Sequence, residues 1–508
     1  MPRRMIRGLK LLSVLSLSLA IGGCIGTWGI APQDHSLPAN TLATDEAIQN
    51  AAKDAHWPAA QWWRAYSDEQ LDRWIELAAQ GSPSLAMAAA RVRQAKAMAG
   101  IAESAESVHV NGDSTLKRHN WPTDQFYGPG ALANTSTWDN NASLGLSYSL
   151  DLWGRESNTT EQALDLAHMT AAESRLAQLE LQNNIVRAYI QLSLNYAQRD
   201  IVEATLAQQQ QILDLAQRRL SGGIGTHFEV SQAETPLPET HRQIDALDEA
   251  IDLSRNQLAA LAGKGPGEGA KLQRPTLSLQ AALKLPSALP AELLGQRPDV
   301  VASRWRVAAQ ARGIDVAHAG FYPNVDLVGS LGFMATGGGM LSFLSGNKFN
   351  YSVGPAITLP IFDGGRLRAE LGEASAGYDV AVAQYNQTLI NALKDISDQL
   401  IRRASMDKQQ VFTAESVASA QKTYDIALVA YKRGLTDYLN VLNVQTLLFH
   451  QQEIQQQVQA ARLTAHAALV VALGGGLSAG ADSPDEKKTA PSKPPAALEA
   501  LDHMMSRP

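Results

Sequence analysis

The sequence has no internal disulfide, because its 508 residues include a single cysteine, Cys24. It also has no H-E-x-x-H or Walker A motif, and its 11 histidines are scattered along the chain. The glycine-rich stretch 263–267 is followed by glutamate rather than by Lys-Ser/Thr, so we interpret it as a linker. These absences predict neither a cofactor nor a metal, and they point away from an enzyme.

The apolar segment near the N-terminus, residues 11–21, is too short to span a bilayer as a helix. Four basic residues precede it, so residues 1–23 read as a bacterial export signal. Removing the signal changes the formal net charge from −7 to about −11. A mature chain this acidic argues against nucleic acid as a partner.

The end of this signal resembles a bacterial lipobox, in which cleavage frees a cysteine for acylation, here by a palmitate-type chain at Cys24. Ile25 stands where an aspartate would retain such lipoproteins at the inner membrane, which implies sorting to the outer membrane. The alternative is an ordinary cleavage site with a cysteine nearby by chance. If Cys24 is acylated, residues 24–56 form the lipid anchor and a polar tether.

Glycine and proline are absent from two long stretches, residues 161–221 and 378–433. A helix over 367–433 would be roughly 100 Å long at 1.5 Å per residue, and its charged residues exclude a position in lipid. Apolar residues step by 4, 4, 3 and 4 positions in both stretches, which indicates coiled-coil packing. They are Leu181, Ile185, Tyr189, Leu192 and Tyr196, then Tyr385, Leu389, Leu393, Ile396 and Leu400.

Period-2 alternation predicts four strands, at about 108–118, 142–152, 324–334 and 350–361. Each is about 10 residues long, as a tilted transmembrane strand requires, although strands of a soluble sheet look the same. Four strands leave two open edges, which cannot exist in lipid. A membrane position therefore requires several protomers to share one barrel, and the pattern does not choose between a dimer with eight strands and a trimer with twelve.

The chain is duplicated with a spacing of 211 positions. Gly154-Arg155 and Gly365-Arg366 share this spacing, and so do two glycine-containing turns at 222–230 and 434–441. In each turn we expect a left-handed glycine to end one helix and a threonine or aspartate to begin the next. We predict repeat 1 over 57–262, an inter-repeat linker over 263–290, repeat 2 over 291–476 and a disordered tail over 477–508.

These features together resemble the TolC-like outer membrane efflux proteins, in their lipoprotein branch (NodT-type). The resemblance covers roughly residues 57–476. It is carried by the lipobox, the motif at 150–155, Arg297-Pro298-Asp299, Tyr322-Pro323, the motif at 359–366 and the two turns. It implies a membrane β-barrel plus a long α-helical coiled-coil barrel, formed by a homotrimer that shares one 12-stranded barrel in the outer membrane.

The function implied by this resemblance is a passive exit duct of a tripartite efflux system. Such a duct passes drugs or toxic small molecules from an inner membrane transporter and a periplasmic adaptor protein to the outside. The alternatives are a lipid-anchored periplasmic coiled-coil scaffold without a pore and a secreted enzyme.

The resemblance also implies two sets of site residues at the turns. Residues expected to contact the adaptor are Gly223, Gly225, Thr226, Gly434, Thr436 and Asp437. Residues expected at the periplasmic gate are Tyr431, Arg433, Asp437, Asn440 and Asn443. Family members commonly carry aspartate where this chain has Asn440 and Asn443, which leaves Asp437 as the candidate for an acidic ring. A packing role for Tyr431 and a solvated charge at Arg433 are equally compatible with the sequence.

Overall fold

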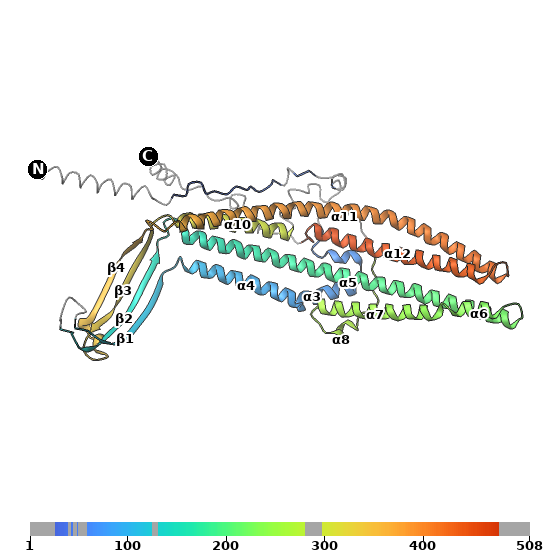
Figure 1. The fold of residues 1–508 in the computed structure, drawn as a ribbon, viewed down its shortest axis with the longest axis horizontal. Helices are drawn as coiled ribbons and strands as arrows, with labels where there is room; N and C mark the ends of the chain where they lie inside the picture. The colour runs from blue at the N-terminus through green and yellow to red at the C-terminus, as the bar shows by residue number, and fades with distance from the viewer. Residues whose placement is uncertain are drawn as a thin grey trace.

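The computed structural model describes residues 26–38, 42–43, 48, 58–123, 131–279 and 297–476. The molecule is elongated, with a four-stranded sheet at one end and helical hairpins at the other (Figure 1). The predicted export signal, Cys24, most of the predicted tether and the predicted tail lie outside the described residues.

Two helices of equal length run along the molecule. Helix α5 spans Arg155–Ser221 and α11 spans Arg366–Lys432, 67 residues each, so both are about 100 Å long. Each follows a glycine with positive φ, Gly154 or Gly365. α11 is the predicted helix 367–433 shifted by one residue. α5 begins six residues before the predicted stretch, because the Asp151 carboxylate accepts the amides of Glu156 and Ser157 and starts the helix there.

Shorter helices complete the bundle. They are α3 (Glu69–Gly81), α4 (Pro83–Ser104), α6 (His227–Glu234), α7 (Leu237–Leu261), α10 (Pro298–Ala319) and α12 (Tyr438–Ala472). The break between α6 and α7 falls at Pro236, because proline cannot continue the hydrogen-bond ladder of a helix. α10 packs against both α5 and α11. Within the described part of the chain, no helix has the length and hydrophobicity needed to cross a membrane.

The sheet is antiparallel and its strands follow chain order. They are β1 (His109–Asn120), β2 (Ser136–Ser149), β3 (Asn324–Thr336) and β4 (Phe349–Thr358). Three predicted strand bounds were wrong. Strand β2 begins six residues earlier than the expected 142. It also ends at Ser149 rather than at 152, because Asp151 turns the chain with φ 41°. β4 stops at Thr358 rather than 361, just before the Leu359-Pro360 pair.

The register gives the sheet one apolar face and one polar face. Val110, Leu146, Gly329 and Val353 pair in one row across the four strands, and directly opposed residues share a face. The apolar face carries mainly Val110, Leu116, Leu144, Leu146, Tyr148, Leu327, Leu331, Phe333, Phe349, Tyr351, Val353 and Ile357. The polar face carries mainly Asn111, Asp113, Thr115, Lys117, Asp139, Asn141, Ser143, Ser147, Ser330, Asn350 and Ser352. All four strand patterns seen in the sequence mark the same face.

The largest hydrophobic cluster among the described residues lies midway along the bundle, where α3 packs on α5 and side chains of α12 join the same cluster. Its polar centre is Asp68, which is 5% exposed. Its carboxylate accepts the amides of Gln70, Leu71 and Thr276 and the hydroxyl of Tyr189. This network joins the start of α3, helix α5 and the segment around Thr276, which follows the short helix α8 (Pro266–Gly269). On α3 itself, Leu71, Trp74, Ile75 and Ala78 lie at helical spacing and are all buried here.

The segment 26–38, which we call the strap, lies along α11. Side chains of α11 hold the strap by hydrogen bonds to the backbone of the strap. Arg368 donates to the carbonyl oxygens of Gly26 and Trp28, and Asp379 accepts the amides of Gln33 and Asp34 at 2.9 and 3.0 Å. Asn386 accepts the amide of Leu37 at 2.8 Å and donates to the carbonyl of His35. The sequence predicted a polar tether here and gave no sign of these contacts, because backbone groups bound by a distant helix leave no pattern in the segment itself.

Candidate functional site

The first hairpin turn joins α5 to α6 at the far end of the bundle. Gly223 has φ 73°, as predicted for the residue that ends the helix. The amides of Ile224 and Gly225 both donate to the carbonyl oxygen of Arg219, at 3.0 and 2.9 Å. A Cβ at Gly225 would lie 2.7 Å from the backbone nitrogen of Leu220, so the turn has no room for a side chain there.

The second turn repeats this geometry between α11 and α12. Gly434 has φ 73° and the amide of Leu435 donates to the carbonyl oxygen of Ala430 at 2.9 Å. The returning helices are capped as the sequence predicts. Thr226 forms a capping box with Glu229, and the Asp437 carboxylate accepts the amide of Asn440 at 3.0 Å. The two tips are therefore rigid turns of the same construction.

A cluster of buried tyrosines packs the two hairpins together. Tyr424, Tyr431 and Tyr438 are all buried, with the rings of Tyr431 and Tyr438 6.1 Å apart. The guanidinium of Arg219, from the end of α5, lies 5.3 Å from the ring centre of Tyr431. This cation–π contact joins hairpin 1 to hairpin 2 within one protomer. The sequence marked Tyr431 but gave no sign of Arg219, because these two residues are more than 200 positions apart.

Electrostatics in this cluster favour neutral tyrosines. Burial is the main cause that raises the pKa of Tyr431; Glu229 raises it further and Arg219 opposes the shift. Burial likewise raises the pKa of Tyr438 to about 12. Both hydroxyls lack a hydrogen-bond partner in the described protomer, as does the Nε of Arg219. A buried polar group without a hydrogen bond costs desolvation free energy. These three groups therefore reduce the stability of the packing between the two hairpins.

The other expected gate residues lie on the surface. Arg433, Asp437, Asn440 and Asn443 are all exposed in the protomer. Arg433 makes no ion pair among the described residues, and Asp437 uses its carboxylate as a helix cap. Tyr431 is therefore packed inside the described chain, whereas these four side chains lie on its surface.

Exposed apolar side chains surround the tip turns. Ile224, Phe228, Leu435 and Leu439 are all exposed, and each follows a turn glycine within five residues. The expected tip residues were glycines, a capping aspartate and threonines, so the sequence analysis missed these apolar groups. The signal that could have found them is the pair of equivalent positions Ile224 and Leu435, both apolar directly after a glycine.

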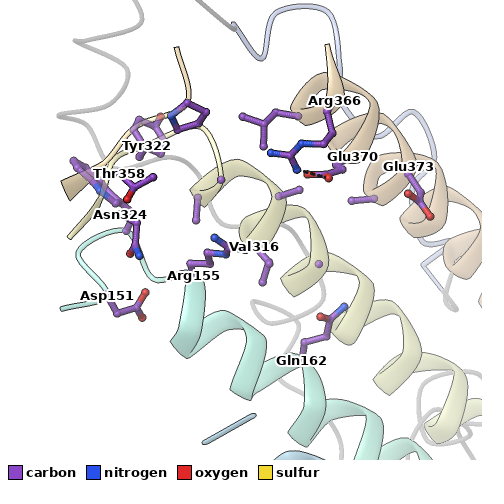
Figure 2. A pocket seen from close by; sticks show the side chains of 18 of the residues that line it. Asp151, Arg155, Gln162, Val316, Tyr322, Asn324, Thr358, Arg366, Glu370 and Glu373 are labelled. Carbon is purple, nitrogen blue, oxygen red and sulfur yellow. Dashed lines mark hydrogen bonds and ion pairs between the residues drawn. The ribbon is translucent and has the colours of Figure 1, made fainter. Parts of the chain in front are cut away.

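A cavity of about 660 Å³ lies where the sheet meets the helices (Figure 2). Polar side chains line it, including Arg155 from α5, Gln310 from α10 and the ion pair Arg366–Glu370 from α11, 2.6 Å apart. The ring of Trp153 stacks on Tyr322 at 4.9 Å and its Nε1 donates to the carbonyl of Pro323. The motifs that mark the resemblance therefore build the junction between strands and long helices.

In the comparison with known proteins, one family model matches the chain in two separate segments. The family model described as "Outer membrane efflux protein" matches residues 74–264 and 289–475. The chain is 54% identical over 371 residues to the "Fusaric acid resistance protein FusA" of Burkholderia cepacia, covering 73% of this chain and 70% of that protein. It is 28% identical over 492 residues to the "Multidrug resistance outer membrane protein MdtP" of Escherichia coli K12, covering 94% and 99%.

Solved structures show the same fold. The outer membrane protein VceC from Vibrio cholerae superposes with a TM-score of 0.77 at 33% identity, covering 83% of this chain and all of that chain. The outer-membrane channel OprN superposes with a TM-score of 0.79 at 26% identity, covering 88% and 99%. The chain therefore belongs to the outer membrane efflux protein family, whose members are transport proteins of the outer membrane and not enzymes.

Proposed function

We propose that this protein is the exit duct of a tripartite efflux system, a trimer whose sheets close into one 12-stranded barrel above a helical tunnel. The observation that carries the proposal is the sheet. One of its faces is apolar and the other polar, while β1 and β4 each keep one unpaired edge. An apolar outer face suits lipid and a polar inner face suits a water-filled pore, and lipid requires the open edges to be paired.

An exposed apolar row on α11 supports assembly with a second copy. Ile390, Ile401 and Phe412 are exposed and lie 11 positions apart. Eleven residues make just over three full turns, so the three side chains lie on one side of the helix. A row of this kind along a polar helix is suited to side-by-side contact with the next protomer.

The strap supports a lipid anchor at Cys24. It places Gly26, two residues beyond Cys24, against Arg368, the third residue of α11 and close to the end of the sheet. Two further residues of chain span at most about 7 Å. An acyl chain on Cys24 would therefore start at the membrane surface that the apolar face of the sheet defines.

The hairpin tips are suited to a periplasmic adaptor protein. Rigid turns carrying exposed Ile224, Phe228 and Leu435 offer small apolar anchors at the end of the tunnel. Energy for transport would come from the inner membrane transporter. The adaptor would open the duct by binding the open arrangement of hairpin 2 more tightly than the closed one. In this proposal Arg433, Asp437, Asn440 and Asn443 line the closed gate, and Tyr431 holds it from within.

The cargo we propose is a toxic small molecule. One relative is named for resistance to fusaric acid and another for multidrug resistance. Deletion of the gene in its own host should lower the inhibitory concentration of fusaric acid or of several drugs, and the Cys24→Ala variant should complement poorly.

The decisive experiment measures the mass of detergent-extracted protein by light scattering and its conductance in a planar bilayer. A trimer with a small conductance that grows when Tyr431 is replaced would support the duct. A monomer, or a trimer without conductance in any variant, would overturn it in favour of a periplasmic scaffold.

A further inference from the structure

The loop between β3 and β4, residues 337–348, folds back on the sheet. Gly337 and Gly338 have φ of 102° and 78° and reverse the chain directly after β3. Two short 3₁₀ turns follow, Ser342–Leu344 and Gly346–Lys348. The Ser342 hydroxyl donates to the carbonyl of Gly339 at 2.8 Å, and this bond holds the fold-back compact.

The loop lies on the apolar face of the sheet. Asn140 pairs with Leu116 on β1 and with Ala335 on β3, and all three belong to that face. The side-chain amide of Asn140 donates to the carbonyl oxygen of Met340 at 2.7 Å. Asn140 is 2% exposed and Ala335 is also buried, whereas most of the face is open. The loop therefore covers this end of the apolar face.

The loop presents a new apolar surface in place of the one it covers. Its Phe343 is buried, while Met340, Leu341 and Leu344 are 45%, 59% and 52% exposed. The loop joins β3 to β4 at the end of the sheet remote from the helices (Figure 1), where the paired Phe333 and Phe349 have their rings 5.6 Å apart. Exposed leucines in a loop are unfavourable in water and favourable among acyl chains.

We propose that the loop 337–348 is a lipid-binding lip, in which Met340, Leu341 and Leu344 insert among the acyl chains of the outer leaflet. The inference rests on the proposed function, since it requires the apolar face to lie in lipid. The loop is continuous with the apolar face of the sheet and not with the polar face. A loop that extends the lipid-facing surface should itself contact lipid. The lip therefore lies outside the pore and does not close its outer mouth.

Spin labels at three positions test the lip in full-length protein reconstituted into liposomes. The variants are Leu341→Cys in the loop, Val353→Cys on the apolar face and Ser352→Cys on the polar face, with labelling of the parent protein as a check on Cys24. Collisions with oxygen report lipid, and collisions with a water-soluble nickel chelate report water. We expect the oxygen-to-nickel ratio at position 341 to match position 353 and to exceed position 352 severalfold.

The outcomes separate the lip from the proposed function. If position 353 lies in lipid but position 341 behaves like position 352, the lip is wrong and the duct stands. If position 353 itself lies in water, the membrane position of the sheet fails, and the lip with it. Replacing Asn140 with alanine should lower the ratio at position 341 but not at position 353, because only the loop depends on that hydrogen bond.

A conductance measurement distinguishes a lip from a plug. Changing Met340, Leu341 and Leu344 together to serine removes the apolar surface without shortening the loop. The single-channel conductance of this variant should equal that of the parent protein. An increased conductance would place the loop in the pore and overturn the inference.

Discussion

Replacing Arg219 tests whether the contact between the two hairpins holds the duct closed. Arg219→Ala removes the guanidinium that lies over the ring of Tyr431 but leaves the tyrosine cluster packed. A partly desolvated cation–π contact contributes about 1 kcal/mol. If three hairpins open together, their contacts contribute about 3 kcal/mol, which corresponds to an increase in the open-to-closed ratio on the order of 100-fold.

Single-channel recording in planar bilayers measures this change as open probability. Arg218→Ala is the matched control, because Arg218 is the adjacent arginine, is exposed, and makes only a surface ion pair with Asp214. Arg219→Lys keeps the charge but loses the planar contact, so it should fall between the parent and the alanine variant. An Arg219→Ala channel that opens no more often than Arg218→Ala would refute the reasoning.

Three further predictions concern the turn, the buried histidine and the strap. Gly225→Ala should loosen the first tip more than Gly223→Ala in hydrogen exchange, because a Cβ at Gly225 would meet backbone at 2.7 Å, whereas a Cβ at Gly223 meets no atom and adds only the strain of φ 73°. Burial lowers the pKa of His466 to about 4, so the unfolded chain, with a pKa near 6.5, takes up the proton first. The free energy of unfolding should then be highest above pH 6.5 and fall toward pH 4, and His466→Gln should flatten this dependence in thermal melts. Asp379→Ala should expose the strap to the protease Asp-N, whereas Glu373→Ala, whose side chain lines the junction cavity, should not.

Local sequence patterns predicted the elements well. The long helices, the turn glycines and the capping residues Thr226 and Asp437 each depend on neighbours within a few positions, which periodicity and capping rules capture. Strand ends were predicted less well. The polar start of β2 at Ser136 lacks apolar alternation, so only pairing with β1 reveals it.

Long-range contacts could not be predicted. Arg219 reaches Tyr431, and Arg368 reaches the strap across 342 positions, without any spacing that a single sequence displays. The same holds for Asn140, a polar residue in an apolar row whose role depends on a loop 200 positions away. The turn glycines therefore lie where the sequence placed them, whereas the long-range contacts around Tyr431 and the strap were missed. The roles expected of the site residues stay predictions.

The equal length of α5 and α11 restricts how such a protein can change its size. Inserting one residue into either helix would rotate everything beyond it by about 100° and move its tip by about 1.5 Å. The apolar positions would then face the wrong neighbours, and the two tips would no longer be level. Insertions of 11 residues disturb the rotation by only about 20°, so the tunnel is expected to lengthen in such steps and in both helices at once.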